Sequence, residues 1–92
     1  MNLTDKVTAE EGVVVTQLQG ELVLLHLETS NYYGLDAVGA KAWEVLVTQG
    51  GTIADACTAI ALEFDAEPPR IEADLFALLA ALESAKLVRV VP

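Results

Sequence analysis

The side chains that could carry out chemistry in this chain are few, and their spacing matches no common catalytic or metal-binding arrangement. The chain has one histidine, His26, and one cysteine, Cys57. A metal site needs several ligands held together, and a cysteine nucleophile needs a general base beside it. Carboxylates are plentiful but unpaired by spacing, and Gly50-Gly51 fits a helix stop rather than a phosphate-binding loop. The sequence therefore predicts no catalytic residue, no metal site and no cofactor.

The groups that remain available for binding are backbone hydrogen-bond donors and acceptors, and the segment that could offer them lies just before the middle of the chain. An apolar run ends at Leu27, a polar turn follows, and residues 32–35 (YYGL) form a short aromatic stretch without charge. In so small a chain we expect such a strand at or near a sheet edge, where its N–H and C=O groups can pair with an extended peptide. Peptide capture is therefore the leading hypothesis.

The composition is that of one small acidic domain. The chain has 92 residues, and 14 acidic against 5 basic side chains give a formal net charge of −9. The basic residues are scattered, whereas nucleic-acid binding needs clustered cations, so no nucleic-acid partner is expected. No apolar run reaches the roughly 20 residues of a membrane span, no secretory signal is evident, and a lone cysteine cannot form an internal disulfide. We therefore expect a cytoplasmic protein that does not contact membranes.

The aromatic strand is predicted to belong to a three-stranded sheet, which positions it. Residues 1–12 are polar and predict a flexible N-terminal tail, followed by a domain over residues 13–92. Residues 13–18, 21–27 and 30–35 predict three antiparallel strands joined by short turns. The middle strand is apolar on both faces, which predicts a central position in the sheet.

Three helices are predicted after the sheet. Asp36 caps the first, Gly50-Gly51 ends it, Thr52 caps the second, and Pro69 serves as the first residue of a long third helix. Residues 87–91 are either a short closing strand or an extended tail. The order predicts an α+β fold that is winged helix-turn-helix-like, with a three-stranded antiparallel sheet followed by three helices.

The predicted third helix is apolar on two sides. Its core face is a leucine-rich stripe, and the opposite face carries small side chains and one phenylalanine where a solvated helix should carry charge. We interpret this second face as a wall of a peptide groove, although alanine is also frequent for its helix propensity. Asp74 flanks the stripe and could meet a basic group of a ligand. The predicted peptide-binding residues are Asn31, Tyr32, Tyr33, Gly34, Leu35, Ala73, Asp74, Phe76, Ala77 and Ala80, with the question of which tyrosine faces the groove left open.

Residues 24–46 (LLHLETSNYYGLDAVGAKAWEVL) resemble the PqqD-like family, and the likeness extends over residues 13–90. The landmarks are the Tyr-Tyr-x-Leu, Val-Gly-Ala and Trp positions in order, with the DLFALLAAL and KLV segments near the end. Asp36 replaces a usual asparagine and keeps the helix cap, and Gly34 is smaller than the residue of many relatives. The resemblance implies a winged-helix-like RiPP recognition element, which binds the leader of a ribosomally made natural product, most like the lasso-peptide biosynthesis type.

The resemblance implies how such a domain works. The leader adds as a strand beside the third strand and packs against the third helix, and the protein delivers the precursor to a leader peptidase and a cyclase. One alternative is a PqqD-type chaperone that delivers a precursor to a radical SAM enzyme. Another is a homodimeric assembly module whose aromatic strand pairs with its own copy, and a third is a DNA-binding regulator, which the acidic charge disfavours.

Overall fold

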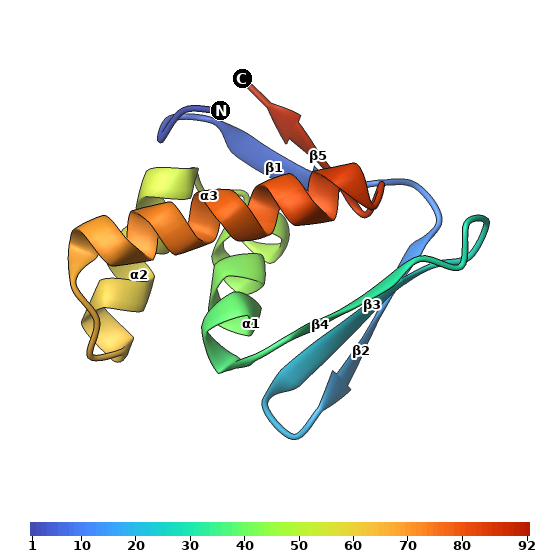
Figure 1. The fold of residues 1–92 in the computed structure, drawn as a ribbon, viewed down its shortest axis with the longest axis horizontal. Coiled ribbons are helices and arrows are strands. Elements are labelled where there is room, and N and C mark those ends of the chain that lie inside the picture. The colour runs from blue at the N-terminus through green and yellow to red at the C-terminus, as the bar shows by residue number, and fades with distance from the viewer.

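The computed structural model describes residues 1–92 as two small antiparallel sheets packed with a set of helices (Figure 1). The predicted order of a three-stranded sheet followed by three helices is confirmed. In chain order the elements are β1 Lys6–Ala9, β2 Val13–Leu18, β3 Glu21–His26, β4 Tyr32–Leu35, α1 Ala37–Trp43, the π-helix η1 Glu44–Thr48, α2 Ile53–Glu63, α3 Pro68–Ser84 and β5 Val88–Val91.

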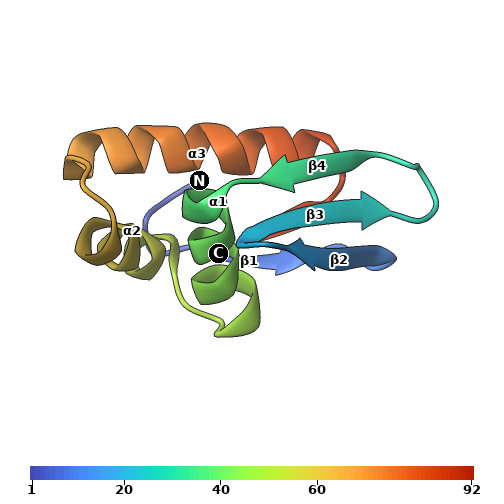
Figure 2. The ribbon, with the colours of Figure 1, turned by 90° about the horizontal axis from the view of Figure 1, so that it is seen from below.

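The larger sheet has the order β2-β3-β4, so β3 is central, as predicted, and β4 is a free edge. Leu24 in β3 is completely buried and pairs with Tyr33 of β4. The strand β4 begins two residues later than predicted because Ser30 adopts a left-handed conformation with φ of 64° and belongs to the turn. Figure 2 shows the three strands side by side with no helix in front of them, so the helices cover only one face of this sheet.

The second sheet corrects the prediction of a flexible tail over residues 1–12. Residues 6–9 form β1, which pairs antiparallel with β5, and the two termini therefore lie together (Figure 1). Val7 is 4% exposed and belongs to the core. The amides of Ile53 and Ala54 at the start of α2 also donate to carbonyls of Asp5 and Leu3. A strand of four residues with only Val7 and Ala9 apolar gives too short a periodic signal, so this pairing was not evident from the sequence.

The caps and the stop predicted for the first two helices are present. Asp36 Oδ1 accepts a hydrogen bond from the Gly39 amide at 2.9 Å, which caps α1. A Cβ atom at Gly39 would lie 3.2 Å from Leu35 Cβ, so the glycine lets α1 pack closely against the end of β4. After the π-helical turn η1, Gly50 takes φ of 73° and ends the first helical segment. The long helix α3 begins at Pro68, one residue earlier than predicted.

A reciprocal cap at the start of α2 gives the fold one acid-sensitive contact. The Asp55 carboxylate accepts from the Thr52 amide, and the Thr52 hydroxyl accepts from the Asp55 amide. These hydrogen bonds with Thr52 lower the pKa of the Asp55 carboxyl from its ordinary value of 3.8. The pKa of Asp55 is lower in the folded state than in the unfolded state. The stabilisation that this cap gives is therefore fully present above the unfolded-state pKa, and it is lost as the pH falls through the folded-state pKa.

We therefore expect Asp55→Asn to be less stable than the parent chain at neutral pH. The gap between the two should close as the pH falls below the unfolded-state pKa of the aspartate and through its depressed folded-state pKa, where the parent carboxylate becomes protonated. Urea unfolding of both proteins from pH 7 to pH 2 measures this gap. A gap that stays the same across that range would show that the carboxylate charge contributes nothing to the cap.

Candidate functional site

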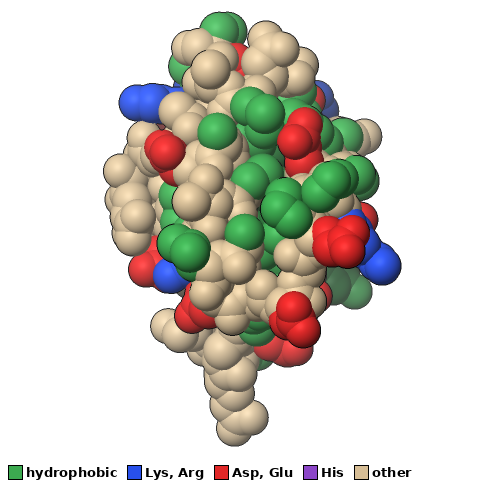
Figure 3. All heavy atoms as spheres, turned by 90° about the vertical axis from the view of Figure 1, so that its left-hand side faces the viewer, with side chains coloured by type: hydrophobic (Ala, Val, Ile, Leu, Met, Phe, Trp, Pro, Cys, Tyr) green, Lys and Arg blue, Asp and Glu red, His purple; other side chains and the backbone are tan.

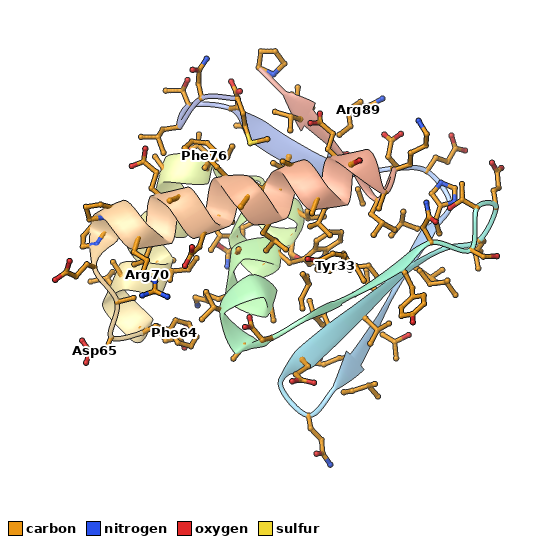
Figure 4. The ribbon with its side chains drawn as sticks, viewed as in Figure 1. Tyr33, Phe64, Asp65, Arg70, Phe76 and Arg89 are labelled. Atoms are coloured by element: carbon orange, nitrogen blue, oxygen red, sulfur yellow. The ribbon has the colours of Figure 1, made fainter.

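A groove runs between the edge strand β4 and the first half of α3, and its ends reach the start of α1 and the end of α2. Its volume is about 420 Å³, and 10 of its 15 lining residues are hydrophobic. We call it the β4–α3 groove. In Figure 4, Tyr33 points from β4 toward the helices, and Phe64 and Arg70 lie at the α2–α3 end. The lining residues are Tyr33, Gly34, Leu35, Asp36, Val38, Gly39, Ala42, Ile60, Phe64, Ala66, Arg70, Ile71, Asp74, Leu75 and Leu78.

The register of β4 determines which backbone groups it offers at the free edge. The His26 amide donates to the Asn31 carbonyl at 2.9 Å, which makes this opposed pair a hydrogen-bonded one. Hydrogen-bonded pairs alternate along an antiparallel ladder, so Tyr33 and Leu35 direct their amides and carbonyls toward β3. Tyr32 and Gly34 direct theirs outward. The free edge therefore offers two donors and two acceptors in the spacing that an added strand requires.

The two tyrosines of β4 lie on opposite faces of the sheet, as strand alternation demands. Tyr33 is half-buried, packs against the hydrophobic core and lines the groove. Tyr32 is 73% exposed on the other face. The structure thus answers the question that the sequence left open, since Tyr33 is the tyrosine of the groove.

Two polar residues fix the start of β4, one by a hydrogen bond to the end of α3 and one by ordering the preceding turn. The Asn31 side chain donates through Nδ2 to the Ala85 carbonyl at the end of α3, at 2.9 Å. His26 is buried, and its Nδ1 accepts from the amides of Glu28 and Thr29 in the turn that leads into β4. In the structure Asn31 ties the start of β4 to the C-terminal end of α3, beyond the groove lining, and His26 orders the turn. The contact of Asn31 with the peptide stays a prediction.

The predicted residues of α3 divide into two groups. Asp74 lines the groove, whereas Ala73, Phe76, Ala77 and Ala80 do not. The three alanines are exposed to solvent, and Phe76 is half-buried on the side of α3 away from β4 (Figure 4). At about 100° per residue, Asp74 and Leu78 occupy one flank of the core stripe and Phe76 the other. The edge strand meets a flank of the helix rather than its back, which periodicity alone does not reveal.

Several groove residues were not among the predicted site residues. Val38 lies in the first turn of α1 and is 37% exposed, and Phe64 caps the end of α2. Ile71, Leu75 and Leu78 were assigned to the core and also form the floor of the groove. The sequence signal for Val38 was its helical spacing with Ala42 and Val45, which indicates a helix face. That spacing identifies a groove only once the position of α3 is known.

The charged residues at the groove are mainly acidic. Asp36 and Asp74 line it, and Arg70 is the one basic lining residue. Arg70 Nε lies 3.6 Å from Asp74 Oδ2, but both side chains are largely exposed, so this ion pair contributes little to stability. Figure 3 shows apolar side chains gathered in the middle of the face at this end of the molecule, with acidic side chains around them.

The remaining reactive side chains do not form a second chemical site. Burial raises the pKa of the Cys57 thiol, and the negative charge of Glu72 raises it further, so the thiol stays protonated at neutral pH. No group of three or more histidine, cysteine and acidic residues is arranged to hold a metal ion. None of the helices combines the length and the apolar character needed to cross a bilayer.

Comparisons with known proteins agree with this architecture. The family model described as coenzyme PQQ synthesis protein D (PqqD) matches residues 21–88. The solved structure of TbiB1 in complex with the TbiA(beta) leader peptide is 36% identical, with a TM-score of 0.81 over 89% of this chain and 94% of that chain. Lasso peptide synthetase B1 complexed with its leader peptide is 23% identical, with a TM-score of 0.82 over 91% and 98% of the two chains, and shows a shared fold. No curated protein matches the chain.

The family match covers the three features on which the groove depends. Residues 21–88 include the edge strand β4, the capped helix α1 and the whole of α3. The match agrees with the resemblance identified in residues 24–46, and that prediction is confirmed. The chain belongs to the PqqD family.

Proposed function

We propose that this protein is a non-catalytic adaptor that binds the leader of a ribosomally synthesised precursor peptide, of the lasso-peptide type. The observation that carries the proposal is the free edge of β4 beside an apolar groove. The outward backbone groups of Tyr32 and Gly34 can pair with one added strand. Alternate side chains of that strand then enter the groove between Tyr33 and Leu78.

The comparisons support the class of ligand. Both solved relatives carry a leader peptide, and the one that is 36% identical aligns along nearly the whole of both chains. We infer that the ligand of this chain is an extended leader with apolar residues at alternate positions. The carboxylates of Asp36 and Asp74 at the groove favour a leader that carries lysine or arginine beside those apolar residues.

The adaptor acts by holding the precursor rather than by reacting with it. With the leader on β4, the rest of the precursor stays tethered at a high effective concentration near any enzyme that the adaptor contacts. A leader peptidase, and a cyclase that closes the core peptide, are the proposed recipients. We place this step in the cytoplasm, where a ribosomal precursor is made.

Fluorescence polarisation with a labelled leader tests the proposal. The probe is the leader encoded beside this gene, and a scrambled leader and a DNA duplex of similar length are the controls. We expect saturable binding of the leader alone, at a dissociation constant of about 1 μM or tighter, equivalent to about −8 kcal/mol. Absence of leader binding by a folded sample would contradict the proposal.

The match to the PqqD model favours one alternative recipient. The adaptor would then deliver its precursor to a radical SAM enzyme, with the same groove and the same mode of leader binding. The two recipients are separated by mixing the adaptor and its precursor with each enzyme in turn. The enzyme whose turnover depends on the adaptor is the recipient.

The alanine face of α3 provides a test of where the leader lies. Ala77 is exposed and does not line the groove, so we expect Ala77→Glu to change leader affinity by less than about twofold, or about 0.4 kcal/mol. Glutamate is a good helix former, which keeps α3 intact. The same polarisation assay measures the affinity. A loss of tenfold or more would show that the leader extends over the back of α3, as the sequence had predicted.

A further inference from the structure

The turn between β3 and β4 is built around one buried imidazole. His26 is 7% exposed, and its Nδ1 accepts from the amides of Glu28 and Thr29 at 3.2 and 3.4 Å. A nitrogen that accepts carries no proton, so we assign the imidazole proton to Nε2. Nε2 has no hydrogen-bond partner within the chain, and no such side-chain atom is buried, so it reaches the solvent. The turn therefore requires a neutral imidazole, although the ring is open to protonation.

These two hydrogen bonds hold a turn that is otherwise weakly determined. Ser30 has a positive φ of 64°, which residues other than glycine adopt rarely. The backbone closes the turn from the Ser30 amide to the His26 carbonyl and from the His26 amide to the Asn31 carbonyl, both at 2.9 Å. The amides of Glu28 and Thr29 make no other hydrogen bond within the chain. Nδ1 is thus the one internal acceptor for the tip of the turn.

Protonation would reverse the role of Nδ1. An imidazolium donates from both nitrogens, so a third N–H would face the two amide N–H groups and the turn could not keep its shape. The turn leads into Asn31, whose side chain is tied to the Ala85 carbonyl, and then into Tyr32. Tyr32 supplies the first outward amide and carbonyl of the free β4 edge, whereas Gly34 lies further along the ladder with β3. A change in the turn therefore reaches one half of the edge that the leader needs.

We propose that His26 is a positioning residue for the leader, which holds the start of β4 in its binding register only while the imidazole is neutral. Leader affinity then falls as the pH falls from about 8 to about 5, the range in which histidine ordinarily changes charge. This inference rests on the proposed function. Because the leader binds the form with a neutral imidazole, linkage requires that a bound leader also favours the neutral form.

The charged groups around the imidazole come from the turn, from the segment before β2 and from the end of the chain. They are Glu28 in the turn, Glu10 and Glu11 before Gly12, Arg89, which lies 3.8 Å from Glu10, and Lys86 after the end of α3. The segment before β2 lies against the ring, since a Cβ atom at Gly12 would be 3.6 Å from His26 Cε1. All of these groups stay in place when only His26 is replaced, so such a variant isolates the contribution of the imidazole.

His26→Asn is the matched variant. The asparagine Oδ1 takes the place of Nδ1 on Cγ and can accept from the same two amides, but the amide side chain does not titrate. We expect the parent chain to lose leader affinity about fivefold between about pH 7.5 and about pH 5.5, and His26→Asn to lose less than about twofold. His26→Leu removes the acceptor and should bind leader weakly at both pH values. Fluorescence polarisation with the labelled leader measures the affinities, and circular dichroism checks that each protein is folded.

The single histidine allows a second measurement that needs no variant. In the isotope-labelled parent chain at about pH 6, the Hε1 resonance of His26 reports the fraction of neutral imidazole. We expect saturating leader to move that resonance toward its high-pH position, and a scrambled leader to leave it unchanged. In the free chain, the amide resonances of Glu28 and Thr29 should follow the same pH profile as the imidazole, because they lose their acceptor on protonation.

The outcomes separate this inference from the proposed function. If the parent chain binds no leader at neutral pH, the proposed function fails and this inference falls with it. If it binds leader with the same pH dependence as His26→Asn, His26 is not the positioning residue. A folded His26→Leu that binds like the parent chain, a His26 resonance that leader does not move, or amides of Glu28 and Thr29 that do not follow the imidazole would also overturn the inference.

Discussion

Replacing Gly34 by proline is expected to weaken leader binding by between about tenfold and a hundredfold while the protein stays folded. The Gly34 amide points to the free edge, so proline removes a donor that only the added strand uses. Removing the donor leaves the leader carbonyl desolvated and without its partner, which costs about 1–3 kcal/mol. Proline is tolerated in an edge strand when its position faces away from the ladder. Polarisation measures the affinity and thermal unfolding checks the fold.

Gly34→Ala is the matched control, because alanine keeps the amide and its Cβ meets nothing within 4 Å. We expect it to bind leader within about twofold of the parent chain, or about 0.4 kcal/mol. The ligand offers a second control without any change to the protein. N-methylation of leader amides that face β4 should abolish binding, and methylation of the alternate amides should not. Equal effects at both sets of amides would contradict strand addition.

The sequence was most informative where several local signals agreed. The uncharged aromatic run after a polar turn predicted the edge strand β4, and the structure places β4 at the edge of its sheet. The helix boundaries were also predictable, because each needs a capping side chain or a left-handed backbone that few residue types supply. These boundary residues are Asp36, Gly50 and Thr52. These predictions depend only on neighbours in the chain, which explains their success.

The sequence was least informative where the answer depends on how elements pack. Ala73 and Ala77 form a small apolar face, yet β4 approaches the flank of α3 that carries Asp74 and Leu78. Helical periodicity gives the relative angles of these faces but not the direction from which a strand arrives. Pairing of β1 with β5 joins the two ends of the chain, and a contact of such long sequence separation leaves no local pattern. Residues 6–9 therefore looked like a tail.

The groove also shows why apolar residues on a core face can belong to a binding site. Ile71 and Leu75 are buried in the core and at the same time form the floor of the β4–α3 groove. Substitutions of these two residues would remove core packing and binding together, so they cannot separate the two roles. A useful probe must line the groove, remain partly exposed and occupy a position where a polar residue does not harm the fold. Val38 meets all three conditions.

Val38→Asp is therefore expected to lower leader affinity at least tenfold, or about 1.4 kcal/mol, without lowering stability. The side chain is 37% exposed and lines the groove, so a bound leader must cover it. Covering a carboxylate costs desolvation energy, and the apolar contact of the valine is lost as well. The fold tolerates the change because Val38 lies in the first turn of α1, where a negative charge favours the helix. Leader titration and thermal unfolding measure the two effects.

Ala37→Asp tests whether the groove position is what matters, since it adds the same charge to the same helical turn. Ala37 is exposed and does not line the β4–α3 groove, so we expect leader affinity to remain within about twofold of the parent value. Val38→Asn separates the two causes of the loss, because its new side chain is polar and uncharged. If Val38→Asn binds leader nearly as weakly as Val38→Asp, the lost apolar contact dominates; if it binds like the parent chain, charge dominates. Tight binding by both Val38 variants would mean that the leader does not enter this end of the groove.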